Sequence, residues 1–162
     1  MRGLPLNGGR GFLVFRKMSE FRISGRPTSG LGWASKTVPR QLPLLLQHLP
    51  ELESCYPATI NLRLEKNLRI EQPDVVTPGI DWSEGWIERL PPETFRLTRI
   101  EFEIVGKHPR QTGWIYEASF SPHRGNAWFV EFLAPFTQYT ATDVFILYFQ
   151  KEARREELVY LS

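Results

Sequence analysis

The sequence predicts a mostly β domain of the α+β class, built as a small closed barrel of six strands with one short helix and a C-terminal helical extension. Prolines and glycines, 13 and 12 of 162 residues, are spread along the whole chain, which is typical of many short elements joined by turns. Several segments alternate apolar and polar residues with the period of two that marks a half-buried strand. Closing such a sheet on itself removes its exposed edges, so a barrel is the economical arrangement.

Size, charge and cysteine content narrow the class of protein. The chain is long enough for one domain with a buried core, and its net charge of +2 argues against nucleic acid as the partner. The single cysteine, Cys55, excludes an intrachain disulfide and is expected to be a buried or half-buried residue rather than a nucleophile. No apolar stretch approaches the roughly 20 residues that span a bilayer, and the run 12–15 is too short for a signal peptide. We therefore expect a cytoplasmic protein without a membrane partner, and the sequence leaves its oligomeric state open.

The chain divides into three parts. Residues 1–17 are rich in Gly and Arg and show little periodicity, so we expect a disordered or artefactual leader, with Met18 as an alternative start. Residues 18–150 are predicted to form the barrel domain. The charged segment 151–162 is predicted to be a helical tail.

The clearest element is a strand at 59–65, where apolar residues occupy even positions and polar residues odd ones. A helix is expected within 40–53, where leucines recur at helical spacing and the prolines stand near the N-terminal end. The segment 71–95 contains four prolines and is predicted to be a long ordered loop, because proline is excluded from central strands. The other five strands are expected at 21–23, 99–105, 113–120, 127–134 and 144–149.

Thr59 and Asn61 are candidate metal ligands. They stand two residues apart on a predicted strand, so both side chains point to one face. A hydroxyl oxygen and an amide oxygen suit Mg²⁺, but they carry no charge, so the ion would come with phosphates. The alternative is an ordinary solvated strand face, although asparagine is disfavoured in strands.

Glu131 is the second unusual residue, because it interrupts a predicted strand, 127–134, that is apolar on both faces. A carboxylate in such surroundings is either ion-paired, exposed at a sheet edge, or kept for function with a shifted pKa. The sequence leaves these three alternatives open.

The turn Ser29-Gly30-Leu31-Gly32 is the third feature. Its two glycines let a backbone pass close to a phosphate and direct N–H groups at it. It lacks the further glycine of a dinucleotide fingerprint and the Gly-Lys-Ser/Thr of a P-loop, so both of those sites are excluded. An ordinary turn is the alternative.

These three features occur in the same order as in the archaeal CTP-dependent riboflavin kinases. That family has a short strand, a Ser-Gly-Leu-Gly turn, a helix, a Pro-Gly-Thr-Leu-Asn-Leu-type motif and, later, a strand with an internal glutamate that ends in Ala-Pro. The chain resembles the family at 29–32, 56–62 and 129–135, and more generally over roughly residues 20–149.

The resemblance implies a cradle-loop barrel that moves the γ-phosphate of CTP to the 5′-hydroxyl of riboflavin, giving FMN and CDP. Thr59 and Asn61 would hold Mg²⁺ together with phosphate oxygens, and Glu131 would bind the flavin or accept the hydroxyl proton. The implied ligands are Mg²⁺, CTP or another nucleotide, and riboflavin or FMN. The implied nucleotide-binding residues are Gly30, Leu31, Gly32, Trp33, Ala34, Ser35, Phe136 and Thr137.

The chain also departs from the family. Trp33-Ala34 follow the turn where the family has Glu-Gly, and Trp33 either stacks on a base or obstructs the pocket. Ala58 replaces a glycine, which matters only if that residue needs a positive φ.

The cations that the family places after Ala-Pro are missing, since the chain reads Phe-Thr-Gln-Tyr at 136–139. Arg26, Lys36 and Arg63 are the candidate substitutes. The missing charge favours an alternative function, a non-catalytic module that binds a nucleotide, a flavin or a protein on the same barrel.

Overall fold

The computed structural model describes residues 18–30 and 32–152, and these form a mostly β molecule with one α-helix. The predicted class, β-rich α+β, is confirmed. Helix α1 (Ala34–Leu45) is followed by a short 3₁₀ turn, η1 (Pro50–Ser54). The strands are β1 (Met18–Pro27), β2 (Ile60–Leu64), β3 (Val75–Val76), β4 (Phe95–Ile104), β5 (His108–Ala118), β6 (Phe129–Leu133) and β7 (Phe145–Glu152).

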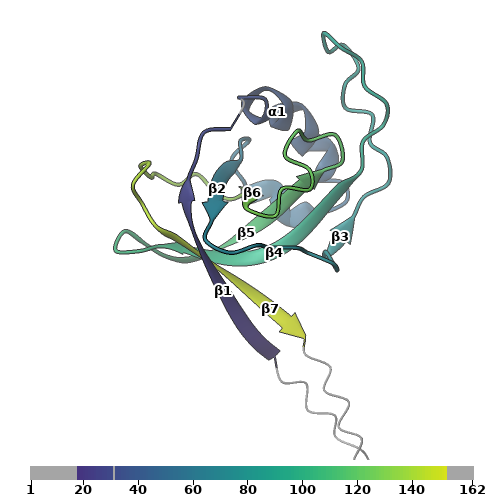
Figure 1. The fold of residues 1–162 in the computed structure, drawn as a ribbon. Coiled ribbons are helices and arrows are strands. Elements are labelled where there is room, and N and C mark those ends of the chain that lie inside the picture. Colours follow the sequence, from purple (N-terminus) through teal and green to yellow (C-terminus); the bar gives the residue numbers. More distant parts are fainter. Residues whose placement is uncertain (1–17, 31, 153–162) are drawn as a thin grey trace, which may run out of the picture.

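The seven strands form one antiparallel sheet in the order β3-β4-β5-β6-β2-β1-β7 (Figure 1). The sheet also returns on itself, because 145–148 of β7 pair with 101–104 of β4. Strand β3 pairs with the other end of β4, at Arg96 and Leu97. The six longer strands therefore make a ring, with β3 at its side.

One hydrophobic core fills the inside of this ring. The even-numbered residues of β2 point inward, so Ile60, Leu62 and Leu64 are buried there. Phe102 and Phe132 meet them from β4 and β6, with ring centroids 4.9 Å apart. The odd-numbered residues of β2, Asn61 among them, are thereby left on the outer face, as is Thr59, which directly precedes the strand.

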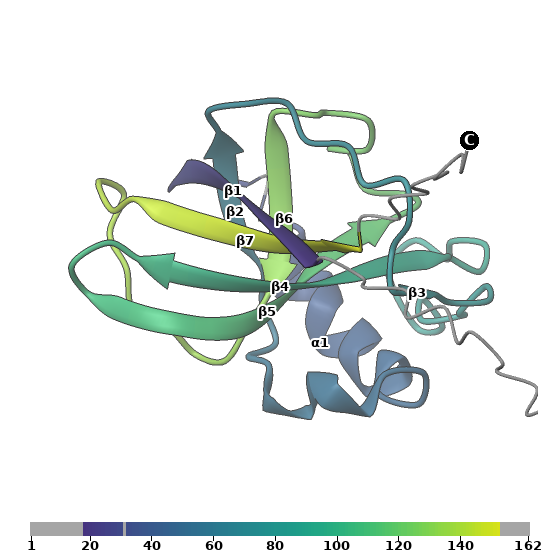
Figure 2. The same ribbon diagram turned by 90° about the horizontal axis from the view of Figure 1, so that it is seen from below.

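A second core lies between α1 and the outer face of β4 and β5 (Figure 2). Val38, Leu42 and Leu45 form the apolar face of the helix, and Leu97 and Tyr116 are among the sheet residues beneath it. Cys55 is buried in this cluster, as predicted. Within the described part of the chain, no helix is long and apolar enough to cross a membrane.

The helix begins and ends earlier than the predicted segment 40–53. It contains Pro39 and Pro43, each of which removes a helical hydrogen bond. The burial of Val38, Leu42 and Leu45 outweighs this local loss, because most helix stability in proteins comes from packing of the apolar face. The C-terminal part of the predicted helix is instead the turn at 46–48 followed by η1.

All six predicted strands are present, but several are longer than their sequence signal. Strand β1 continues to Pro27, beyond the predicted strand 21–23, and β5 starts at His108, before the predicted strand 113–120. Pairing with neighbouring strands extends both elements, because backbone hydrogen bonds between strands form where the local sequence alone does not indicate a strand. The loop 71–95 contains the short β3 and a bridge between Ile80 and Glu93.

The predicted helical tail is wrong at its start, since Lys151 and Glu152 belong to β7. They pair with Ser19 and Met18 of β1. The rest of that tail, 153–162, and the predicted leader, 1–17, lie outside the described residues.

Candidate functional site

The structure brings most of the predicted site residues into one cavity of about 490 Å³, here called the Asn61 cavity. It lies on the outer face of the ring, between β2, β6 and the start of α1. Leu31 lies outside the described residues, and Phe136 and Thr137 line a different cavity, beside Lys107 and His108. The predicted site residues that line the Asn61 cavity are Gly30, Gly32, Trp33, Ala34, Ser35, Thr59, Asn61 and Glu131.

Thr59 and Asn61 form a pair with the geometry of neighbouring metal ligands. The Thr59 hydroxyl donates a hydrogen bond to Asn61 Oδ1 over 2.9 Å, which confirms that the two side chains share a face. Adjacent ligands of an octahedral Mg²⁺, each 2.0–2.1 Å from the ion, are also about 2.9 Å apart. The pair therefore fits Mg²⁺, with the remaining ligands and the compensating charge coming from elsewhere.

Gly30 passes directly over the Asn61 side chain. A Cβ at Gly30 would lie 2.2 Å from Asn61 Nδ2, so no other residue fits without displacing the amide. The backbone N–H of Thr28 donates to the backbone carbonyl of Asn61 over 3.0 Å and holds the segment before Gly30 in place. Gly32 has a φ of +76°, a conformation that favours glycine. Both glycines of the turn are thus explained by geometry at the cavity.

Glu131 lies directly across from Asn61 in the pairing of β2 with β6, so both side chains point to the cavity face. Strand β6 has neighbours on both sides, which excludes an edge position. No ion pair joins Glu131 to a cation among the described residues. Burial raises its pKa to about 7, against the weaker opposing effect of a 3.4 Å hydrogen bond from the Ser121 hydroxyl. Of the three alternatives, a carboxylate held with a shifted pKa remains.

Sequence reasoning missed the wall that the loop 71–95 contributes. Trp82 and Trp86 line the cavity with their rings in edge contact, 6.0 Å between centroids. The guanidinium of Arg40, a residue of α1, lies 5.2 Å from the Trp86 ring centre and steadies that ring. The loop has no periodicity that could have placed these residues, but its two tryptophans were a compositional signal.

Buried polar residues fix this wall. Glu93 accepts hydrogen bonds from Trp82 Nε1 at 2.9 Å and from the backbone N–H of Phe120 at 2.6 Å. The Tyr116 hydroxyl donates to Gln41 of α1. Burial raises the pKa of both Glu93 and Tyr116. The wall is therefore a preformed surface of aromatic rings and hydrogen-bonded polar groups.

Two predicted departures from the family are resolved by the geometry. Trp33 is 54% exposed, so its ring lies at the cavity mouth and does not fill the interior. No described residue other than glycine has a positive φ, so Ala58 has no backbone strain at the position where the family motif has a glycine.

The third departure from the family is the lack of cationic side chains, and it concerns the charge of the Asn61 cavity. None of the described residues that line it is Lys or Arg, whereas Glu88, Glu93 and Glu131 are acidic. The N-terminus of α1 opens on it at Ala34 and Ser35, and the N-cap residue Trp33 has no side-chain acceptor for the free N–H groups. The backbone N–H groups at the start of α1 are thus among the donors that this cavity offers to an anion.

A scan against models of known protein families and a search of curated proteins both found no match for this chain. The resemblance to the riboflavin kinases therefore rests on its three motifs and remains a prediction.

Proposed function

We propose that this protein is a Mg²⁺-dependent phosphotransferase of the riboflavin-kinase type. It would move a phosphate from a nucleoside triphosphate, CTP in that family, to riboflavin and give FMN. The observation that carries the proposal is that Asn61 of β2 faces Glu131 of β6, with Thr59 bonded to Asn61, beside the glycine turn. The closed ring of six strands supports the finer proposal that the fold is the cradle-loop barrel of that family.

Glu131 is proposed as the general base. A carboxylate with a pKa of about 7 is half ionised at neutral pH, which suits proton transfer from an alcohol during catalysis. The Ser121 hydroxyl holds the carboxylate from one side. The riboflavin ring would lie against Trp82 and Trp86, since aromatic side chains bind flat ring systems. Its ribityl hydroxyl then faces Glu131.

Thr59 and Asn61 are proposed to position the donor. They would hold Mg²⁺, which when bound neutralises charge on the phosphate oxygens. The free N–H groups at the start of α1 add donors for the same oxygens. Phosphoryl transfer depends mainly on positioning and charge neutralisation, and these groups supply both.

A non-catalytic module that binds a flavin or nucleotide is the second candidate. It is favoured by one observation, the absence of Lys and Arg among the described residues that line the Asn61 cavity. Such a cavity suits a neutral aromatic ring better than a triphosphate.

A ligand panel with product analysis separates the two candidates. The protein is incubated with CTP, ATP or GTP and Mg²⁺, each with and without riboflavin, and is followed by thermal shift and product mass. The kinase proposal predicts FMN and a nucleoside diphosphate, with no FMN from Asn61→Ala at equal folded concentration. Stabilisation by riboflavin without FMN from any nucleotide would favour the binding module. No response to any ligand would contradict both.

A further inference from the structure

A second cavity adjoins the Asn61 cavity and contains an arginine, the kind of side chain that the first one lacks. This cavity of about 510 Å³, here called the Arg63 cavity, is bounded by the segment before the glycine turn, by β2 and by the loop before β6. His123 lines both cavities, and Ser29 of the second is followed directly by Gly30 of the first. The residues that line the Arg63 cavity are Thr28, Ser29, Arg63, His123, Asn126, Trp128 and Phe129.

The two cavities share one face of the same two strands. Arg63 stands two residues after Asn61 on β2, and Phe129 stands two residues before Glu131 on β6. Residues two apart on a strand point to the same side. The cross-strand pair Asn61–Glu131 and the pair Arg63–Phe129 are therefore neighbours on one face, two residues apart along each strand.

Arg63 is also opposed by a second arginine. In the pairing of β1 with β2, Arg26 lies directly opposite Arg63, an arrangement of like charges that destabilises a sheet. Within the described residues neither arginine forms an ion pair, and Arg26 has only a long hydrogen bond, 3.4 Å, to the Thr142 carbonyl. The next carboxylate on this face, Glu65, accepts a hydrogen bond from Ser24. An anion beside Arg63 would relieve this repulsion.

The remaining residues of the cavity suit a nucleotide. Thr28 and Ser29 bring hydroxyl groups, which bind phosphate oxygens. The His123 ring is stacked on Phe129 with centroids 3.9 Å apart, which fixes the ring while leaving its nitrogen edge available. Trp128 is 50% exposed and offers an indole face on which a base can stack.

We propose that the Arg63 cavity binds the polyphosphate of a nucleoside triphosphate through Arg63, with its base against Trp128. The terminal phosphate then points along β2 to Thr59 and Asn61, and riboflavin occupies the Asn61 cavity. The identity of the ligand as a phosphoryl donor rests on the proposed function. Of the candidate substitutes for the missing cations, the structure selects Arg63, because it lines the second cavity whereas Arg26 and Lys36 line neither.

Binding measurements on the whole chain test this assignment. Calorimetric titrations with Mg²⁺ present use three probes, namely CTP, inorganic tripolyphosphate and cytidine. We expect Arg63→Gln to weaken the binding of both CTP and tripolyphosphate by about 10- to 100-fold in Kd, the usual value of a charge-assisted contact. Arg63→Lys should weaken the binding of both less. Trp128→Ala should weaken the binding of CTP but not that of tripolyphosphate, because only CTP has a base to stack on the indole.

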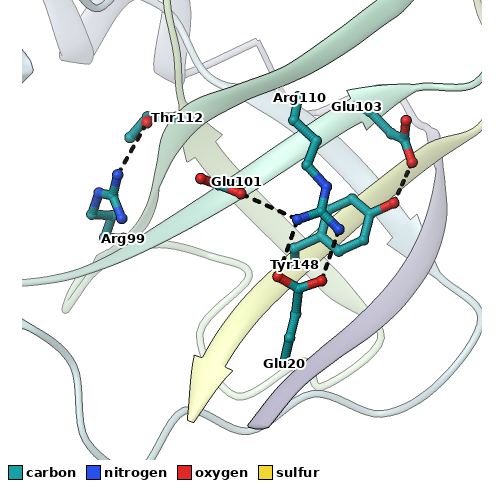
Figure 3. A network of polar contacts seen from close by, with 7 residues as sticks. All are labelled: Glu20, Arg99, Glu101, Glu103, Arg110, Thr112 and Tyr148. Atoms are coloured by element: carbon teal, nitrogen blue, oxygen red, sulfur yellow. Dashed lines mark hydrogen bonds and ion pairs between the residues drawn. The ribbon is translucent and has the colours of Figure 1, made fainter. Parts of the chain in front are cut away.

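Arg99→Gln is the matched control, since Arg99 is an exposed strand arginine on β4 whose side chain bonds to Thr112 (Figure 3). It should bind every probe as the wild type does. Tripolyphosphate binding that is unchanged in Arg63→Gln, or absent from the wild type, would overturn the assignment.

The outcomes also separate this assignment from the proposed function. If Arg63→Gln loses tripolyphosphate binding while the wild type forms no FMN, the anion site stands and the kinase proposal fails. If the wild type forms FMN and Arg63→Gln keeps its KM for CTP, the activity stands and the assignment of the Arg63 cavity fails.

Discussion

Two polar clusters on this molecule differ in whether their charged side chains are paired with opposite charges. On the outside of the ring, Arg110 of β5 lies between Glu20 and Glu101, with N–O distances of 2.7 and 3.3 Å, and over the ring of Tyr148 (Figure 3). This cluster, here called the Arg110 network, ties β5 to β4, β7 and β1. Every charge in it has an opposite charge beside it.

The Asn61 cavity lacks such compensation. Arg110 lowers the pKa of Glu20, whereas burial raises that of Glu131. The Thr59 hydroxyl of the cavity bonds only to the neighbouring Asn61 oxygen within the described residues. A cluster that serves the fold is paired within the protein, and one that is partly buried and left unpaired points to a ligand. This contrast is the main reason for placing function at the cavity.

The largest expected effect is on turnover. Glu131→Gln keeps the shape of the side chain but removes its charge, so we expect FMN formation to fall by roughly 10²- to 10⁴-fold, the usual contribution of a general base. Initial rates at saturating CTP and riboflavin measure it. Arg110→Gln is the control and should turn over as the wild type does. Equal losses in both variants would erase the distinction between the clusters.

The next effect concerns the glycine turn. Gly30→Ala places a Cβ against the Asn61 amide, so we expect Mg²⁺-dependent CTP binding to weaken by about tenfold or more. The same clash should lower the unfolding free energy of Gly30→Ala. In an Asn61→Ala background the clash is gone, so Gly30→Ala should change the unfolding free energy much less than it does in the wild type. A double-mutant cycle from denaturant unfolding measures this coupling. Additive effects would show that the close contact is unimportant.

The pH dependence of stability reports on Glu131 directly. Its pKa is about 7 in the folded protein and about 4.5 in the unfolded chain, so the folded state holds the proton more tightly. The stabilisation is complete below pH 4.5 and is lost as the pH rises through 7, by up to roughly 3 kcal/mol. The difference in unfolding free energy between Glu131→Gln and wild type should therefore grow over this range. Glu93 and Glu117, whose pKa values burial also raises, are present in both proteins and cancel.

The smallest effect is expected in the Arg110 network. Arg110→Gln should lower Tm slightly, because exposed ion pairs contribute little, and the difference should shrink as salt screens the wild-type pairs. Thermal unfolding at low and high ionic strength measures it. A loss that is large and independent of salt would mean that packing over Tyr148, and not charge, is what the network contributes.

Local pattern predicted the central strand and the shared face of Thr59 and Asn61 well. The strict alternation at 59–65 placed Thr59 and Asn61 on one face, and their 2.9 Å hydrogen bond confirms it. Glu131 was recognised because a carboxylate in an apolar strand conflicts with its surroundings. Its position opposite Asn61 is a matter of strand register, which no local pattern contains.

Features that depend on distant contacts were not predictable. The aromatic wall of Trp82 and Trp86 comes from a loop whose course is set by a bridge between Ile80 and Glu93. Phe136 and Thr137 follow the family motif in sequence, yet the chain carries them to another cavity after β6 ends. Arg63 was one of three equivalent cations until the register of β1, β2 and β6 placed it beside Asn61.

The central claim, that the polar groups of the Asn61 cavity are kept for a ligand, is tested most directly by thermal shift with CTP and Mg²⁺. The wild type should gain roughly 5–10 °C in Tm at a hundredfold excess over Kd, and only when Mg²⁺ is present. Asn61→Ala should unfold at nearly the same temperature as the wild type without ligand, and should gain nothing with it. A wild type that ignores CTP and Mg²⁺, or an Asn61→Ala variant that responds equally, would contradict the account.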